Sequence, residues 1–199
     1  LLTNLWTQGM TGSDAPEASN ANVWTLNVSG QSWTALTDIS NSGTSLSAGQ
    51  GFLVYVFDDT DYDGTSDLPA IISITGTENN GNVTISSVPA NGWVLAGNPY
   101  SSTIDWDLVS DDNSPFGSTA YVWDDATSSY KSWNGSGSLI DGLIAPYQAF
   151  WVQNTFAPNQ TLTISESHKA SRSGILYRDV ELKESGSVSL DISSNIFQD

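Results

Sequence analysis

The chain repeats itself. Large apolar residues of its first half recur in its second half, at an offset of 100 residues at the start that falls to 98 at the end. The clearest blocks are Val-Trp at 23–24 with 122–123, Ser-Trp at 32–33 with 132–133, and GQGFLV at 49–54 with YQAFWV at 147–152. A small drift is what loop insertions produce, so the spacing predicts one structural unit that occurs twice in tandem.

The repeated residues are mostly aromatic, and a bulky residue kept at the same strand position in both copies is expected to pack in a core. The sequence therefore predicts that the matched tryptophans and phenylalanines hold β-layers together. The matched pairs are Trp6/Trp106, Trp24/Trp123, Trp33/Trp133 and Phe52/Phe150.

Strand patterns fill the chain, and no stretch of eleven or more residues has helical periodicity. Short β-branched and aromatic runs alternate with Gly, Asn, Ser and Asp clusters, which is typical of antiparallel β-proteins. We expect strands at 23–28, 32–36, 51–57, 70–75, 82–87, 92–97, 119–124, 130–133, 148–153, 160–165, 174–182 and 187–193. The predicted fold class is all-β, with two pseudo-repeated antiparallel sandwich-like or barrel-like units packed as one domain. A β-propeller fragment is the alternative, but two repeats cannot close a propeller.

Three segments are expected along the chain. Residues 1–90 form the first β repeat and residues 91–166 the second. Residues 167–199 carry an alternating apolar pattern that predicts a hairpin, which either completes the domain or starts the next module.

The charge restricts the class of partner. There are 22 acidic residues against 5 basic ones, a formal net charge of −17. Nucleic acids and anionic membranes bind basic patches, so neither is an expected partner. Aromatic residues make up 11% of the chain, which distinguishes it from a disordered acidic tail. There is no cysteine, and no apolar run is long enough for a membrane span.

Three motifs carry a resemblance to a known family. These are residues 92–106 (GWVLAGNPYSSTIDW), 120–123 (AYVW) and 144–152 (IAPYQAFWV). Together they resemble domains of large secreted Bacteroidota surface proteins, which usually precede a sorting domain for type IX secretion. The resemblance covers roughly residues 1–195, and Ser101 stands where the family often has Pro. It implies an extracellular, cell-surface location and neighbouring domains or subunits as partners, and it transfers no catalytic residue.

Residues 59–67 (DTDYDGTSD) have the spacing of a calcium loop. Alternate carboxylates can converge on one hard cation, the glycine permits a sharp turn, and the residue after it can offer a carbonyl. The expected Ca²⁺ ligands are Asp59, Asp61, Asp63, Thr65 and Asp67. Ala70 stands where an EF-hand needs Glu, so the loop is closer to those of thrombospondin-type repeats. The alternative is a solvated loop of Asx turns without metal.

Aromatic residues outside the repeat are candidates for contact with a ligand, because flat rings stack on sugars. They are Tyr62, Trp93, Tyr100, Tyr147 and Trp151. A structural role for each is the alternative, since Trp and Tyr commonly lie between a core and its rim.

No catalytic arrangement is expected. The acidic pairs lie in loop-like sequence without a hydrolase motif, and His168, the only histidine, is expected at the surface. The predicted function is a non-catalytic extracellular β-module with an adhesion, spacer or assembly role. The alternative is a carbohydrate-binding module of a secreted hydrolase.

Overall fold

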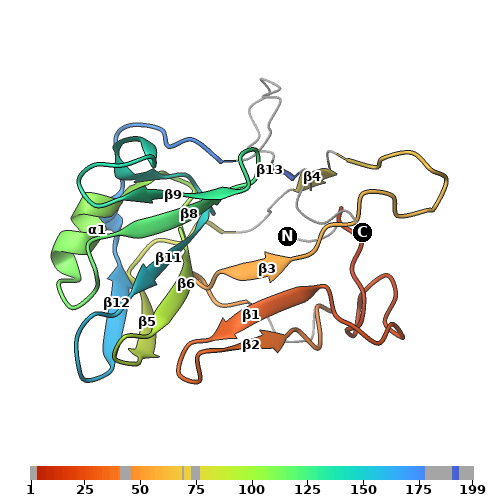
Figure 1. Cartoon of the computed structure of the whole chain (residues 1–199), viewed down its shortest axis with the longest axis horizontal. Helices are drawn as coiled ribbons and strands as arrows, with labels where there is room; N and C mark the ends of the chain where they lie inside the picture. Colours follow the sequence, from red (N-terminus) through yellow and green to blue (C-terminus); the bar gives the residue numbers. More distant parts are fainter. Residues whose placement is uncertain (1–3, 41–45, 69, 73–76, 178–189, 193–199) are drawn as a thin grey trace.

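The fold is mostly β, as the sequence predicts. The computed structural model describes residues 4–40, 46–68, 70–72, 77–177 and 190–192, and all observations below concern these residues (Figure 1). The strands are β1 (Val23–Asn27), β2 (Ser32–Ala35), β3 (Phe52–Val54), β4 (Ala70–Ile72), β5 (Val83–Val88), β6 (Trp93–Gly97), β7 (Ile104–Asp105), β8 (Ala120–Asp124), β9 (Ser129–Trp133), β10 (Leu143–Ile144), β11 (Ala149–Gln153), β12 (Gln160–Ile164) and β13 (Leu190–Ile192). Two short 3₁₀ turns, Ile140–Gly142 and Glu166–His168, lie between strands.

Two antiparallel sheets dominate the arrangement. One has the order β2-β1-β3 and the other the order β6-β11-β8-β9. An antiparallel bridge between Gln50 and Ala96 joins them, so the chain just before β3 lies along the free edge of β6. The backbone hydrogen bonds Gly51 N to Leu95 O (3.1 Å) and Gly97 N to Gly49 O (2.8 Å) secure this junction. The strands β2, β1, β3, β6, β11, β8 and β9 therefore follow one another across the molecule, as Figure 1 shows.

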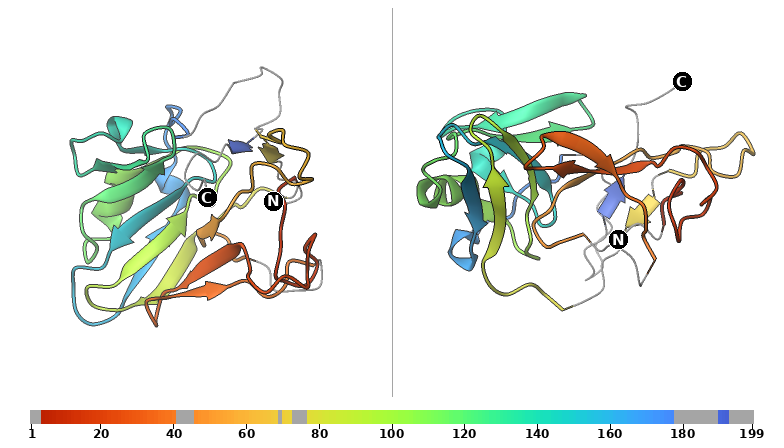
Figure 2. Two further views of the ribbon diagram at one scale, coloured as in Figure 1. Left: turned by 45° about the vertical axis from the view of Figure 1, so that its right-hand side comes forward. Right: turned by 90° about the horizontal axis from the view of Figure 1, so that it is seen from below.

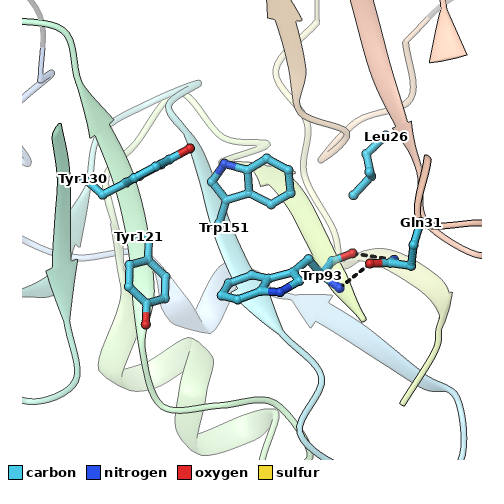
Figure 3. A pocket seen from close by; sticks show the side chains of 6 residues that line it. All are labelled: Leu26, Gln31, Trp93, Tyr121, Tyr130 and Trp151. Atoms are coloured by element: carbon cyan, nitrogen blue, oxygen red, sulfur yellow. Dashed lines mark hydrogen bonds between the residues drawn. The ribbon is translucent and has the colours of Figure 1, made fainter. Parts of the chain in front are cut away.

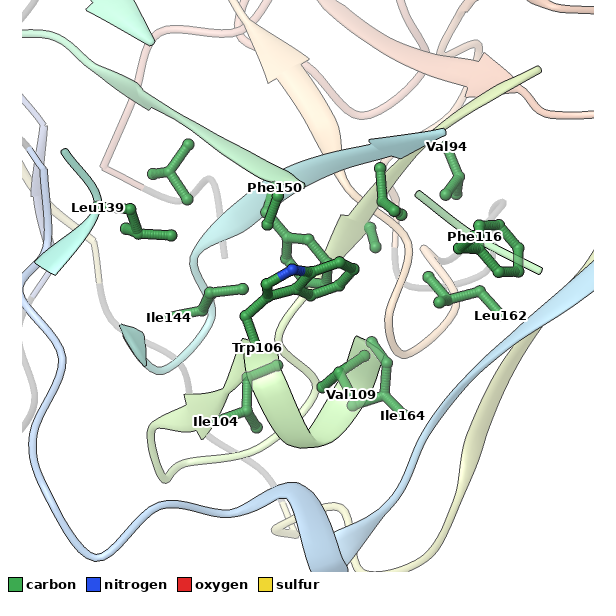
Figure 4. Packing of buried hydrophobic residues seen from close by; sticks show 14 of the residues in the cluster. Val94, Ile104, Trp106, Val109, Phe116, Leu139, Ile144, Phe150, Leu162 and Ile164 are labelled. Carbon is green, nitrogen blue, oxygen red and sulfur yellow. The ribbon is translucent and has the colours of Figure 1, made fainter. Parts of the chain in front are cut away.

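The main hydrophobic core lies behind the four-stranded sheet. Phe150 of β11 and Trp106 contact each other at its centre, with ring centroids 5.7 Å apart (Figure 4). The antiparallel pair β5-β12 closes the opposite side through Val88, Leu162 and Ile164. These layers form the sandwich-like part of the fold.

A short helix, α1 (Trp106–Asp112), is the one α-helix among the described residues. Asp105 caps it by accepting a hydrogen bond from the backbone N–H of Asp107, at 3.0 Å. Its inner face buries Trp106 and Val109 in the main core. Seven residues are too few for the helical period to appear in an eleven-residue window, which is why the pattern misses it.

The first half of the chain has only small cores. Leu5 packs with Val56, and Met10 packs with Val23 and Leu36. Strand β5, which the predicted boundary at residue 90 assigns to the first repeat, pairs instead with β12 and lines the main core. Figure 2 shows the β2-β1-β3 sheet lying beside the larger body built by residues 77–177.

The matched tryptophans do not occupy matching places. Both hairpins have four-residue turns, at 28–31 and 125–128, but Trp33 pairs with Leu26 whereas Trp133 pairs with Ala120 at the far end of its strand. Trp33 is also 44% exposed, so the prediction that every matched ring is a core residue is wrong for it. Only Trp106 and Phe150 are fully buried among the matched aromatic residues, because the second half alone has two layers to enclose them.

The C-terminal segment is described in part. Residues 174–177, where a strand is expected to begin, have no strand structure. Strand β13 pairs with β4 in antiparallel register, which joins the segment to the first half. The remainder of the hairpin expected within 167–199 lies outside the described residues. Within the described ranges, none of the helices has the length and apolarity that a membrane span requires.

Candidate functional site: an aromatic groove and an acidic loop

Alternation along three strands places aromatic rings on the outer face of the four-stranded sheet. In β6 and β11, Val94 and Val152 point into the core, so Trp93 and Trp151 point outward. In β8, Val122 points inward and Tyr121 outward, directly opposite Trp151 in the antiparallel register. Neighbouring strands lie about 4.8 Å apart, so these outward rings are close enough to form one surface.

These rings line an open groove of about 560 Å³ (Figure 3). Tyr130 of β9 extends the wall supplied by the four-stranded sheet. Leu26 of β1 and Gln31 of the following turn line the groove from the first half of the chain. The groove therefore lies where the two sheets meet, and both halves of the chain form it.

The rings meet edge to face. Trp93 and Trp151 have centroids 6.4 Å apart and planes at 82°, and Trp93 and Tyr121 are 5.8 Å apart at 60°. Trp33 meets Trp151 from the first half, at 5.8 Å and 89°. Such contacts are a preferred geometry for aromatic pairs. They hold the rings in fixed orientations while leaving ring faces open to the groove.

Gln31 ties the two halves together at the groove. Its side-chain amide accepts a hydrogen bond from the Trp93 backbone N–H (2.7 Å) and donates one to the Trp93 carbonyl (2.9 Å), as the dashed lines in Figure 3 show. The same amide donates to the Val28 carbonyl at 2.6 Å. Because Gln31 completes the hydrogen bonding of β6 at this point, it fixes the position of Trp93.

The aromatic side chains that line the groove also carry hydrogen-bond donors, which are indole N–H and phenol O–H groups. The indole N–H groups of Trp93 and Trp151 and the hydroxyls of Tyr121 and Tyr130 make no hydrogen bond within the described part of the chain. Trp123 lies beside Tyr130, with ring centroids 5.0 Å apart and planes at 74°, and so supports its ring. The groove thus offers chiefly apolar ring faces, and polar atoms form only a small part of its surface.

The loop between β3 and β4 brings three of the five predicted metal ligands together. Carboxylate oxygens of Asp59, Asp61 and Asp67 all lie within 4.8 Å of one another. Two oxygens on opposite sides of a calcium ion, each about 2.3–2.6 Å from it, are about 5 Å apart, so this spacing fits the ion. Asp59 Oδ1 is buried and has no hydrogen-bond donor among the described residues.

A fourth predicted ligand, Asp63, lies outside this cluster and is hydrogen-bonded within the loop. Asp63 Oδ1 accepts hydrogen bonds from the Thr65 backbone N–H (2.8 Å) and from the Thr65 hydroxyl.

Within the cluster, the Asp67 carboxylate accepts hydrogen bonds from the hydroxyl and the backbone N–H of Thr60, which lower the pKa of the Asp67 carboxyl. Asp67 is therefore held in the charged form that a cation requires.

His168 is buried, which corrects its expected surface position: it is 1% exposed. Its Nδ1 accepts from the Ser165 backbone N–H at 3.1 Å, so the proton of the neutral ring lies on Nε2. Nε2 lies 2.9 Å from Asp112 Oδ2 and 3.1 Å from Ser165 Oγ. A catalytic triad needs the carboxylate and the hydroxyl on opposite ring nitrogens, and here both contact the same one. The histidine instead ties α1 to the turn at Glu166–His168.

The predicted aromatic contacts separate into distinct groups. Trp93 and Trp151 line the groove. Tyr100 is fully buried in the main core, where its hydroxyl donates to backbone carbonyls, and is therefore not available to a ligand. Tyr62 is 86% exposed in the acidic loop, and Tyr147 lies in a turn outside the groove.

The sequence does not predict four of the residues that line the groove, which are Leu26, Gln31, Tyr121 and Tyr130. Alternation around Val122 is a signal that could have placed Tyr121 outward, and the register of β8 with β9 then places Tyr130 beside Trp123. Leu26 and Gln31 gave no such signal, because their role depends on how the two sheets meet.

Comparison with protein-family models, curated proteins and solved structures finds no match to this chain. The function is therefore argued from the geometry of the groove and the loop.

Proposed function

We propose that the chain is a non-catalytic extracellular β-module that binds a glycan in the aromatic groove. The observation that carries the proposal is the cluster of four outward aromatic rings, Trp93, Trp151, Tyr121 and Tyr130, around one open groove. Sugar rings present C–H faces that pack against aromatic rings and hydroxyls that hydrogen-bond to indole N–H and phenol O–H groups. The groove supplies chiefly the first kind of contact.

Adhesion is the cell-surface role that such a groove supports. A spacer or assembly module requires no concave aromatic site, and exposed apolar patches on soluble proteins commonly mark places of interaction. The resemblance of residues 92–106 to secreted Bacteroidota surface proteins supports display outside the cell. Attachment to a secreted hydrolase is the alternative context for the same binding activity.

We further infer that the two halves descend from one duplicated unit. The orders β2-β1-β3 and β9-β8-β11 are equivalent, and the two hairpin turns have equal length. Strand equivalence places Trp24 with Tyr121 and Trp33 with Tyr130, since Asn27 pairs with Ser32 as Asp124 pairs with Ser129. The groove then forms between related outer faces of the two copies.

Calcium is proposed as a stabilising ion of the loop at residues 59–67. Asp59, Asp61 and Asp67 would hold it, and the orphaned Oδ1 of Asp59 supports this assignment. Three carboxylates so close together repel one another without a cation. The ion would order the loop, which lies apart from the groove in sequence and in lining residues.

Titration with soluble polysaccharides, followed by tryptophan fluorescence, tests the glycan proposal. Saturable quenching or a spectral shift is expected, because Trp93 and Trp151 lie at the site. Trp151→Ala should weaken binding about tenfold, the equivalent of about 1.4 kcal/mol. Phe156→Ala removes a ring that is also exposed but lies outside the groove, and should bind like the parent protein. No saturable response to any glycan would remove the proposal.

A further inference from the structure

The geometry points to a single, uncharged glycan chain as the ligand, in preference to an acidic polysaccharide or the flat face of a crystalline one. This inference rests on the proposed function and specifies its ligand class. It follows from two separate properties of the groove, its lack of charge and the angles between its rings.

The lining contains no Asp, Glu, His, Lys or Arg side chain. Leu26, Gln31 and the four aromatic residues form it, and the Gln31 amide is engaged with the backbone. An acidic sugar would therefore meet no cation, and moving a carboxylate or sulfate against this surface costs hydration without a compensating partner. Hydroxyl groups lose much less and can be satisfied by the ring donors.

Among the described residues, the basic side chains outside the groove are paired with acidic ones. In the described part of the chain, Lys131 is paired with Asp124 (3.0 Å), Lys169 with Glu78 (3.8 Å) and Arg172 with Asp141 (2.6 Å). The net charge of −17 adds long-range repulsion toward any polyanion. Both the local and the global electrostatics thus select an uncharged ligand.

The ring angles select the form of that ligand. A flat polysaccharide surface needs coplanar rings that it can cover together. Here the planes of Trp151 and Trp93 meet at 82°, so these two rings form a corner of the groove (Figure 3). A planar surface could contact only one of these rings by its face, whereas a single chain entering the corner contacts several.

The size of the groove agrees with this assignment. Its volume of about 560 Å³ lies within the range of roughly 300–1,000 Å³ that is usual for pockets binding small organic molecules. Leu26 and Gln31 line it on the side of the first half. A short stretch of a single chain fills such a space.

The test compares three classes of glycan on the full chain at one ionic strength. Soluble uncharged polysaccharides (glucan, xylan and mannan), soluble acidic ones (alginate and polygalacturonate) and insoluble crystalline cellulose and chitin are used, with affinity electrophoresis or calorimetry for soluble ligands and pull-down for insoluble ones. Binding to at least one uncharged soluble chain is expected. Trp93→Ala and Trp151→Ala should each weaken it about tenfold, and Phe156→Ala should not.

The outcomes separate the inference from the proposed function. Binding only to acidic chains, or only to crystalline material, would overturn the uncharged single chain while glycan binding itself stands. Binding to nothing would overturn both. Binding of an uncharged chain that Trp93→Ala and Trp151→Ala leave unchanged, in variants with a parent-like circular dichroism spectrum, would place the site elsewhere and also overturn the inference.

Discussion

Buried asparagine side chains hold the loops of this protein to its strands. Asn22, Asn98, Asn113 and Asn154 are all buried, and each donates from its amide to at least two backbone carbonyls. Such loops would otherwise bury carbonyls without partners, at a cost of about 1–3 kcal/mol for each unsatisfied group. In a chain without cysteine, these amides take over the role of cross-links between distant segments.

Asn98→Asp is predicted to destabilise the protein strongly. The Asn98 amide donates to the carbonyls of Ser102, Ile144 and Ala145, at 2.9–3.1 Å, and an ionised carboxylate would place negative charge against all three. We expect a loss of about 2–4 kcal/mol in the free energy of unfolding. Urea denaturation at neutral pH measures it, with Asn134→Asp as the exposed control of equal charge change. A loss below about 0.5 kcal/mol would contradict the assigned role.

Among the elements, the β8–β9 hairpin is closed by a charged cluster. Asp124 is 6% exposed, and it accepts hydrogen bonds from Thr127 (2.6 Å) and Lys131 (3.0 Å). Burial opposes its ionisation, but the hydrogen bonds from Thr127 and Lys131 and the charge of Lys131 outweigh that effect, so the pKa of Asp124 lies below its ordinary value.

The hairpin should therefore lose stability in acid. A carboxyl whose pKa is lower in the folded than in the unfolded state stabilises the fold above its ordinary pKa of about 3.9, and that contribution disappears as the pH falls through the folded-state value. Asp124→Asn should cost about 1–2 kcal/mol at pH 7, and its difference from the parent should shrink below about pH 4. Urea denaturation across that range measures the difference, with Asp111→Asn as an exposed control. A difference that does not change with pH would contradict the assignment.

The elements also show what sequence patterns can predict. Alternation located the strands around Trp93, Val122 and Phe150 because each has one face against a core. It missed α1, which is too short to show a period, and it could not place Gln31, whose contacts depend on how two sheets meet. The sequence repetition predicts matching positions for Trp33 and Trp133, but the two rings lie at different places in their hairpins, because rings on the outer face of a sheet are not fixed by core packing.

At the scale of the whole molecule, the two halves differ in the size of their hydrophobic cores. Residues 77–177 enclose one large core, whereas the first half has small clusters and an exposed acidic loop. The groove lies where these halves meet, so its shape depends on the position of the less well-packed half. Stabilising the first half should therefore stabilise the whole domain.

Calcium is predicted to raise the melting temperature of the chelator-treated protein. An ion bound only by the folded state stabilises it by about 1.4–2.7 kcal/mol at ten to a hundred times its Kd, which corresponds to about 3–10 °C for a domain of this size. Differential scanning calorimetry with about 10 mM calcium suits the weak affinity of extracellular sites.

The variant Asp61→Asn should abolish the rise in melting temperature, because Asp61 belongs to the carboxylate cluster. Asp63→Asn is the matched control in the same loop and should retain most of it, because the Asp63 carboxylate is engaged with Thr65. An unchanged melting temperature in the parent protein would reject calcium, and equal loss in both variants would reject the three-carboxylate site.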